Sequence, residues 1–290
     1  MNTSPLDAPE RRPRHLNLGC GSRFHPGWEN VDMFPHDPCV RVHDLRKRTP
    51  YADATFDVVY HSHVLEHFPK NAAHVFLREC HRVLKPGGVI RVAVPDLERI
   101  ARLYLEALEK ASNGVPGWAD NYEWIVMEMY DQTIREESSG AVPEYLARNP
   151  LPNRDFIIER WGAFAIPFLN RYQGNSEANQ NASPQAKTAW GYVIRNPGKV
   201  FHSKLLRLLM SQKDWEALRV GRFRRTGEVH MWMYDFYSLR RVLENAGFNN
   251  PQRVGPAESR IPDWSSFHLD TEPNGQVYKA DSMYMEAVKS

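Results

Sequence analysis

The chain has 290 residues, of which 42% are hydrophobic and 25% charged, as in a globular protein with room for an α/β domain and a large insertion. With 37 basic and 35 acidic residues the net charge is +2, which excludes a general electrostatic drive toward nucleic acid or anionic membranes. Three cysteines are too few for a disulfide framework, and we find neither a signal peptide nor an apolar run of membrane-spanning length. We therefore expect a cytoplasmic protein with no nucleic-acid or membrane partner.

The first ordered stretch predicts the start of a nucleotide-binding sheet. Residues 15–18 read as a buried strand, and Gly19-Cys20-Gly21 ends it in a turn where glycine allows positive φ and close approach of a ligand. A second strand over 28–32 ends in Asp32, where a carboxylate can accept both hydroxyls of a ribose. Phe24 stands where a dinucleotide-binding turn would have its third glycine, so a purely structural turn remains an alternative.

The chain then continues as alternating strands and helices. Two further strands are predicted over 40–42 and 56–61. A helix should begin at Pro69, where proline suits the first turn, and should stop at Lys85-Pro86-Gly87-Gly88. The mostly apolar run 89–94 then reads as a strand buried on both faces, as in a parallel sheet.

Three segments in this order carry a family resemblance: Leu16-Asn17-Leu18-Gly19-Cys20-Gly21, then Phe56–Tyr60 with His63–His67, then Arg82–Gly88. Here the sequence resembles the class I S-adenosylmethionine-dependent methyltransferases, most closely a type 11-like subgroup often associated with saccharides and natural products. The resemblance covers residues 14–100 closely and resumes near 230–248 and at the last strand. It implies a Rossmann-like α/β fold, with a seven-stranded, mostly parallel sheet and a large helical insertion. It also implies S-adenosyl-L-methionine as the cofactor.

The domain organisation follows from where the alternation of strands and helices stops. We predict a flexible tail over 1–13, the α/β domain over 14–110 and 229–290, and a helical insertion over 111–228 that forms the cap or substrate region. The polar segment 174–184 reads as a mobile loop within that insertion.

The resemblance assigns cofactor-binding roles residue by residue. Gly19, Cys20 and Gly21 would offer backbone N–H groups to the carboxylate end, and Asp32 would bind the ribose. The remaining positions would contact adenine or lie nearby: Met33 and Leu45 against the ring face, Asp44 at the exocyclic amine, and His61 at the end of the fourth strand. Asp44 has a simpler alternative as a turn residue.

Methyl transfer is an in-line displacement, so the protein must align the acceptor atom with the methyl group, and an acceptor hydroxyl also benefits from a base. The segment after the fourth strand lies at the ligand-binding edge of such a sheet. We therefore predict His63, Glu66 and His67, together with His230, as catalytic residues. The predicted reaction is O-methylation of a small molecule or saccharide, with nitrogen and carbon acceptors open.

Several alternatives remain open. His63-x-x-Glu66-His67 matches the H-x-x-E-H pattern of one zinc hydrolase group, which needs this pattern on a helix and a third ligand. Some methyltransferases with an E-x-x-E-H segment hold a divalent metal there. This chain has His63 in place of the first glutamate, so we predict no metal. A capped helix start is the structural alternative for Glu66-His67. A third alternative is an inactive, methyltransferase-like binding protein, against which the intact glycine turn, Asp32 and Asp44 argue. Oligomeric state is not readable.

Overall fold

The structure, a computed structural model, describes residues 13–34, 37–173, 206–207 and 209–290. The predicted tail (apart from residue 13) and the predicted loop over 174–184 therefore lie outside the described residues. The chain divides into two compact units, one of Met1–Glu98 with Met231–Ser290 and the other of Arg99–His230. Within the described part of the chain, no helix is both long and apolar enough to cross a membrane.

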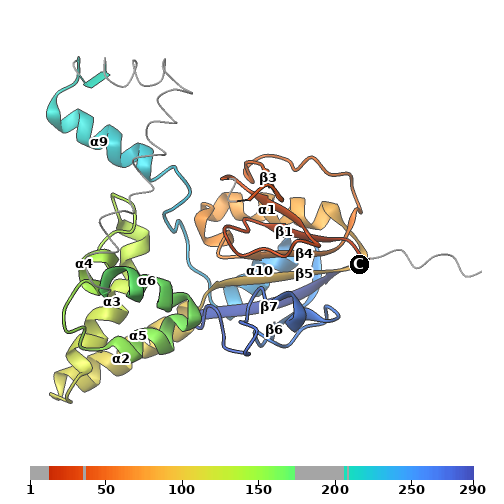
Figure 1. The fold of residues 1–290 in the computed structure, drawn as a ribbon. Helices are drawn as coiled ribbons and strands as arrows, with labels where there is room; N and C mark the ends of the chain where they lie inside the picture. Colours follow the sequence, from red (N-terminus) through yellow and green to blue (C-terminus); the bar gives the residue numbers. More distant parts are fainter. Residues whose placement is uncertain (1–12, 35–36, 174–205, 208) are drawn as a thin grey trace, which may run out of the picture. The chain divides into compact units, whose positions relative to one another are not determined.

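The first unit is built on one seven-stranded sheet in the order β3-β2-β1-β4-β5-β7-β6 (Figure 1). The first five strands pair in parallel, and β7 runs antiparallel to both of its neighbours. The expected seven-stranded, mostly parallel sheet is therefore confirmed. The strand bounds are His15–Leu18 (β1), Glu29–Asp32 (β2), Val40–Val42 (β3), Phe56–Ser62 (β4), Leu84–Pro95 (β5), Phe248–Val254 (β6) and Ser282–Lys289 (β7).

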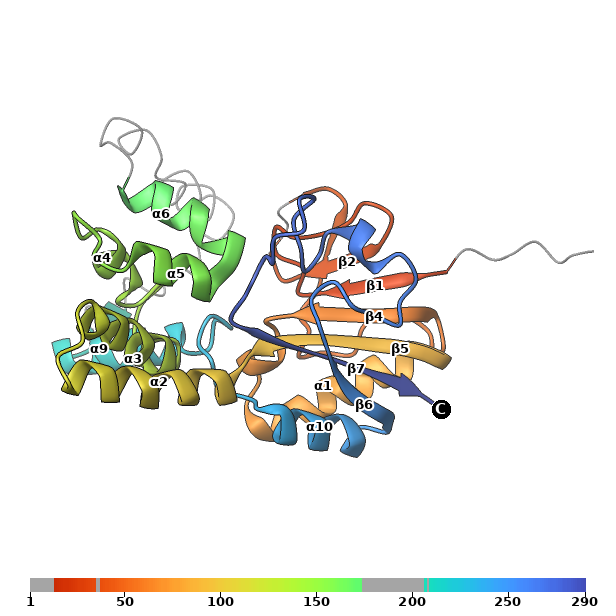
Figure 2. The ribbon, with the colours of Figure 1, turned by 90° about the horizontal axis from the view of Figure 1, so that it is seen from below.

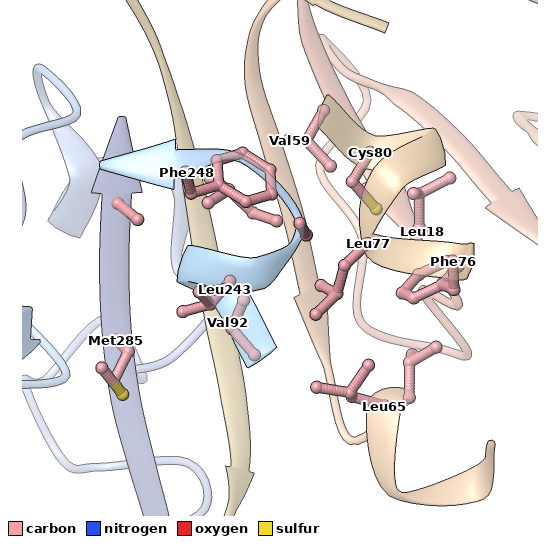
Figure 3. Packing of buried hydrophobic residues seen from close by; sticks show 14 of the residues in the cluster. Leu18, Val59, Leu65, Phe76, Leu77, Cys80, Val92, Leu243, Phe248 and Met285 are labelled. Carbon is pink, nitrogen blue, oxygen red and sulfur yellow. The ribbon is translucent and has the colours of Figure 1, made fainter. Parts of the chain in front are cut away.

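Two helices cover one face of this sheet: α1, Lys70–Val83, and α10, Phe236–Asn245 (Figure 2). Each carries apolar residues three or four positions apart, which places them on a single helical face. In α1 these include Phe76, Leu77 and Cys80, which pack with Leu18 and Val59 of the sheet (Figure 3). Burial of this apolar layer is the main force that holds the helices to the sheet.

The junction between α1 and β5 differs from the sequence prediction. The helix ends at Val83, but β5 already begins at Leu84 and includes the Lys85–Gly88 segment that we predicted only as the stop of the helix. Leu84 pairs with Phe56 and Val89 with Val58, so a long bulge in β5 takes up the residues between them. The proline and glycines thus interrupt the ladder without ending the strand.

The opposite face of the sheet has a different cover. The described residues between β1 and β4 form no helix, and this face is covered instead by residues 255–281, the connection between β6 and β7 (Figure 2). The connection contains the short 3₁₀-helix η3, Trp264–Phe267. It packs Trp264 against Trp28 and Tyr60 of the sheet region, with ring centroids 6.1 and 5.1 Å away.

A buried ionic network fixes this connection to the sheet. Arg91 of β5 is fully buried and donates to Asp270 at 2.8 Å and to Glu286 at 2.7 Å. Its remaining donors bond backbone carbonyls of the connection, including that of Gly255. Asp270 also accepts a 2.5 Å hydrogen bond from Tyr60. These bonds use all donors of the buried arginine and hold the connection in place over this face of the sheet.

The second unit is helical. Its core packs Trp124, Tyr145, Ile157 and Trp161 together. The helix bounds are Leu97–Ser112 (α2, which begins in the first unit), Trp118–Ile134 (α3), Val142–Leu146 (α4), Arg154–Trp161 (α5), Ala165–Gln173 (α6) and Gln212–Phe223 (α9), with a 3₁₀-helix at Gly162–Phe164 (η2). Whether residues 111–228 act as a cap or substrate region stays a prediction.

Candidate active site

The glycine turn lies at the carboxyl end of β1, where Gly19 and Gly21 both have positive φ. A Cβ at Gly19 would come 2.3 Å from a methyl carbon of Val64, whereas one at Gly21 would meet nothing within 4 Å. The backbone N–H groups of Gly19 and Cys20 donate to the Val31 carbonyl, at 2.7 and 3.2 Å. The turn therefore offers open space for a ligand at Gly21, whereas Gly19 is required for the close approach of Val64. The N–H groups of Gly19 and Cys20, which we expected to bind a carboxylate, are used within the fold.

Asp32 ends β2 beside this turn. One carboxylate oxygen accepts the Gly21 N–H at 2.8 Å, and the other accepts the Phe34 N–H at 2.9 Å. These two bonds fix the orientation of the carboxylate. An ionised carboxylate has about four acceptor positions, so acceptor capacity remains for a diol. The local geometry fits a ribose at this place.

The predicted adenine residues are arranged less simply. Asp44 forms a two-pronged ion pair with Arg46, at 2.8 and 2.9 Å, and accepts the Arg46 backbone N–H at 3.1 Å. The hydrogen bonds to Arg46 lower the pKa of Asp44. This is the turn geometry that the simpler alternative predicted. Leu45 packs against the main core, and Met33 is half-buried.

Two further predicted cofactor residues are buried. Cys20 is 7% exposed, and burial raises the pKa of its thiol to about 12, so it stays protonated near neutral pH. His61 of β4 is fully buried, with its ring 5.1 Å from that of Phe76 in α1. Burial lowers the pKa of His61 to about 3, and among the described residues its ring nitrogens find no hydrogen-bond partner. This neutral imidazole lies in the core between sheet and helix.

The residues after β4 gather at the carboxyl edge of the sheet. His63 has a positive φ of 53°, an uncommon conformation for a residue with a side chain. Its Nδ1 atom lies 3.4 Å from a carboxylate oxygen of Glu66. Glu66 is fully buried, which raises the pKa of its carboxyl group to about 8. A strained histidine beside a buried acid is typical of functional sites.

The H-x-x-E-H segment does not form one helix. Only Leu65–His67 is helical, as the 3₁₀-helix η1, and His63 lies outside it. The hydrolase alternative requires His63 and His67 on one face of a helix, and the structure does not show this arrangement. His230 is buried and is the last residue of the second unit, where its N–H donates to the Gln132 carbonyl at 2.9 Å.

Sequence reasoning missed the contribution of the residues that lead into β7. Because β7 is antiparallel, its first residue, Ser282, lies at the carboxyl edge of the parallel strands, paired with Pro95. The Ser282 hydroxyl is hydrogen-bonded to Nε2 of His63 at 2.7 Å. Lys279 and Asp281 both act on Glu66 electrostatically, and burial lowers the pKa of Lys279. No local motif marks these positions.

Tyr234 is a second residue that the sequence did not reveal. It lies before α10, bridged to Asp96 directly after β5. Its side chain is 1% exposed, and its hydroxyl has no hydrogen-bond partner among the described residues. Burial and the nearby Glu66 raise the pKa of this phenol, which keeps it protonated and able to donate.

Comparison with known proteins finds a methyltransferase domain in this chain. Residues 29–92 match the family described as a methyltransferase domain. The chain is 27% identical over 143 residues to the ubiquinone biosynthesis O-methyltransferase of Bradyrhizobium sp. (strain ORS 278), covering 49% of this chain and 48% of that protein. The chain thus spans about half the length of this curated relative.

Among solved structures, the chain is similar to two methyltransferases at low identity. One is a SAM-dependent methyltransferase from Thermotoga maritima, described as a possible histamine N-methyltransferase (11% identical, 97% and 84% of the two chains covered, TM-score 0.37). The other is a SAM-dependent methyltransferase from Archaeoglobus fulgidus (12% identical, 96% and 86% covered, TM-score 0.37). At this low identity and TM-score, neither structure adds to the description of the fold that the strand order gives.

The strand order, the domain match and the curated relative together support a Rossmann-like methyltransferase fold and the class of S-adenosylmethionine-dependent methyltransferases. The family implies S-adenosyl-L-methionine as the cofactor. The described residues fit this group, because the turn at Gly21 is open and Asp32 keeps acceptor capacity beside it.

Proposed function

We propose that the protein is an S-adenosylmethionine-dependent methyltransferase that methylates an oxygen of a small molecule or saccharide. The observation that carries the proposal is the pairing of Asp32 with the glycine turn at the carboxyl edge of a 3-2-1-4-5-7-6 sheet. In open α/β sheets ligands bind outside this edge. The O-methyltransferase relative favours oxygen over other acceptors.

Asp32 would hold the ribose, and Gly21 would allow the cofactor to approach the backbone closely. The methyl group on the sulfonium is the electrophile that the cofactor supplies. The protein contributes a predominantly buried acid and a fixed histidine, Glu66 and His63, at the same edge of the sheet. Burial raises the pKa of Glu66 to about 8, and histidine is the side chain that most often accepts a proton from a hydroxyl in catalysis.

The segment after His230 carries two partly exposed side chains near these groups, those of Met231 and Trp232. The backbone N–H groups of Met231 and Trp232 both donate to the Glu66 carbonyl, at 2.7 and 3.2 Å. Their side chains are 40% and 39% exposed, and the Lys70 ammonium lies 4.5 Å from the centre of the Trp232 ring. An exposed indole beside a cation suits stacking on a sugar or planar acceptor that carries a negative group.

The proposal is tested by transfer of labelled methyl groups. Each reaction contains the protein, S-adenosylmethionine with a tritiated methyl group, and one class of acceptor. The acceptor classes are phenols, catechols, sugars and amines. We expect label in hydroxyl-bearing compounds with wild-type protein and with Asp53→Asn, a control at an exposed carboxylate. Asp32→Asn should transfer much less. Label confined to amines would refute the oxygen assignment, and no transfer together with no cofactor binding would refute the methyltransferase itself.

Metal dependence is resolved by the same assay. If activity falls after chelation and returns with added Mg²⁺, Mn²⁺ or Zn²⁺, the predicted absence of a metal is wrong. Hydrolytic activity restored by Zn²⁺, with no methyl transfer, would favour the hydrolase alternative.

A further inference from the structure

Three side chains from distant parts of the first unit meet at the carboxyl edge of the sheet. Ser282 starts β7, His63 follows β4, and Glu66 lies in η1. The Ser282 hydroxyl is 2.7 Å from Nε2 of His63, and Nδ1 of the same ring is 3.4 Å from Glu66. The two ring nitrogens thus face two different partners, one hydroxyl and one acid.

We propose that Ser282, His63 and Glu66 form a proton relay for the acceptor, in which Ser282 is the residue that exchanges the proton with the substrate. The proposal rests on the proposed methyltransferase function and adds Ser282 to it. His63 is the proton store, and Glu66 is a positioning residue that sets which ring nitrogen carries the proton.

The direction of the relay follows from the geometry. Once Glu66 is ionised, above about pH 8, its carboxylate beside Nδ1 favours a proton on that nitrogen, which leaves the lone pair on Nε2 to accept the Ser282 O–H. Because the Ser282 hydroxyl already uses Nε2, an acceptor hydroxyl reaches His63 only through the Ser282 oxygen. The positive φ of His63 is consistent with a ring held in one orientation at some cost in backbone energy.

The step balances as follows. The new bond from the methyl carbon to the acceptor oxygen forms as the carbon–sulfur bond breaks, and that electron pair stays on sulfur. The acceptor proton passes to the Ser282 oxygen, and the proton of Ser282 passes to Nε2 of His63. Above about pH 8, where Glu66 is ionised, the resulting imidazolium lies against its carboxylate, which stabilises the positive charge. Lys279 and Asp281 are the other charged groups that act on Glu66.

The relay is tested by nuclear magnetic resonance on protein with ¹⁵N-labelled histidine, without cofactor and at about pH 9, where Glu66 is ionised. His63→Gln assigns the His63 signals. We expect a proton on Nδ1 and none on Nε2 in wild-type protein. Ser282→Ala should shift the Nε2 signal, which loses its hydrogen bond, while the proton stays on Nδ1 beside Glu66. Glu66→Gln should move the ring toward the Nε2–H form that isolated imidazoles favour, and Ser282→Thr should restore the wild-type spectrum.

Ser266→Ala is the matched control, since its hydroxyl donates only to the Asp263 carbonyl in η3 and the His63 signals should not change. A wild-type proton on Nε2, or a Ser282→Ala spectrum equal to wild type, overturns the relay. Calorimetric titration with S-adenosylhomocysteine separates this from the proposed function. Failure of wild-type protein to bind it counts against the methyltransferase, whereas normal binding with a His63 spectrum that Ser282→Ala leaves unchanged counts against the relay alone.

Discussion

Glu66→Gln should change how the stability of the protein depends on pH. Glu66 is fully buried, and burial raises its pKa from the usual 4.5 to about 8. Between these two values the folded protein holds a proton on Glu66 that the unfolded chain has released. The folded state therefore binds more protons, and its stability must fall as the pH rises through this window. Glutamine has the same shape and does not titrate, so the variant should lack this loss.

The size of the effect follows from linkage. A fully effective group costs about 1.4 kcal/mol for each pH unit, so wild-type protein should lose up to about 2.7 kcal/mol relative to Glu66→Gln between about pH 5.5 and 7.5. In a unit of this size the thermal midpoint would fall by roughly 5–10 °C relative to the variant. Tryptophan fluorescence during heating measures it, and Glu106→Gln, at an exposed helical ion pair, serves as control. Parallel pH profiles for wild type and Glu66→Gln would refute the raised pKa.

Three other outcomes follow from the same structure. Arg91→Ala should destabilise the first unit by about 3–5 kcal/mol in urea unfolding, because two buried carboxylates lose their partner, whereas a variant that also removes those carboxylates should recover much of the loss. His63→Gln should lower turnover by roughly 10²–10⁴-fold with cofactor affinity nearly intact; full turnover would make the histidine structural. Thiol reagents should modify exposed Cys39 rapidly and Cys20 slowly, since burial holds the Cys20 thiol protonated; equal rates would contradict its burial.

The sequence predicted those parts of the fold that rest on local patterns. The strand over 15–18, the glycine turn and Asp32 lie within 18 residues of one another, and period and turn chemistry suffice to find them. The bulge in β5 was missed because Pro86, Gly87 and Gly88 favour a turn locally, and only pairing with β4 keeps them in the strand.

The site residues that the sequence did not predict come from distant parts of the chain. Ser282 meets His63 across 219 residues of sequence, and it does so only because β7 enters the sheet antiparallel. No spacing rule connects these two positions. Likewise, the ion pair of Asp44 with Arg46 depends on side-chain geometry that a motif does not encode.

The central claim is that the glycine turn and Asp32 bind S-adenosylmethionine, and calorimetric titration of that cofactor tests it most directly. Hydrogen bonds to a charged group contribute about 1.5–3 kcal/mol, so Asp32→Ala should weaken binding by roughly 10- to 150-fold. Asp53→Ala should bind like wild type, and circular dichroism establishes that each variant is folded. Unchanged affinity in a folded Asp32→Ala protein, or tight binding of NAD in place of S-adenosylmethionine by wild type, would contradict the account.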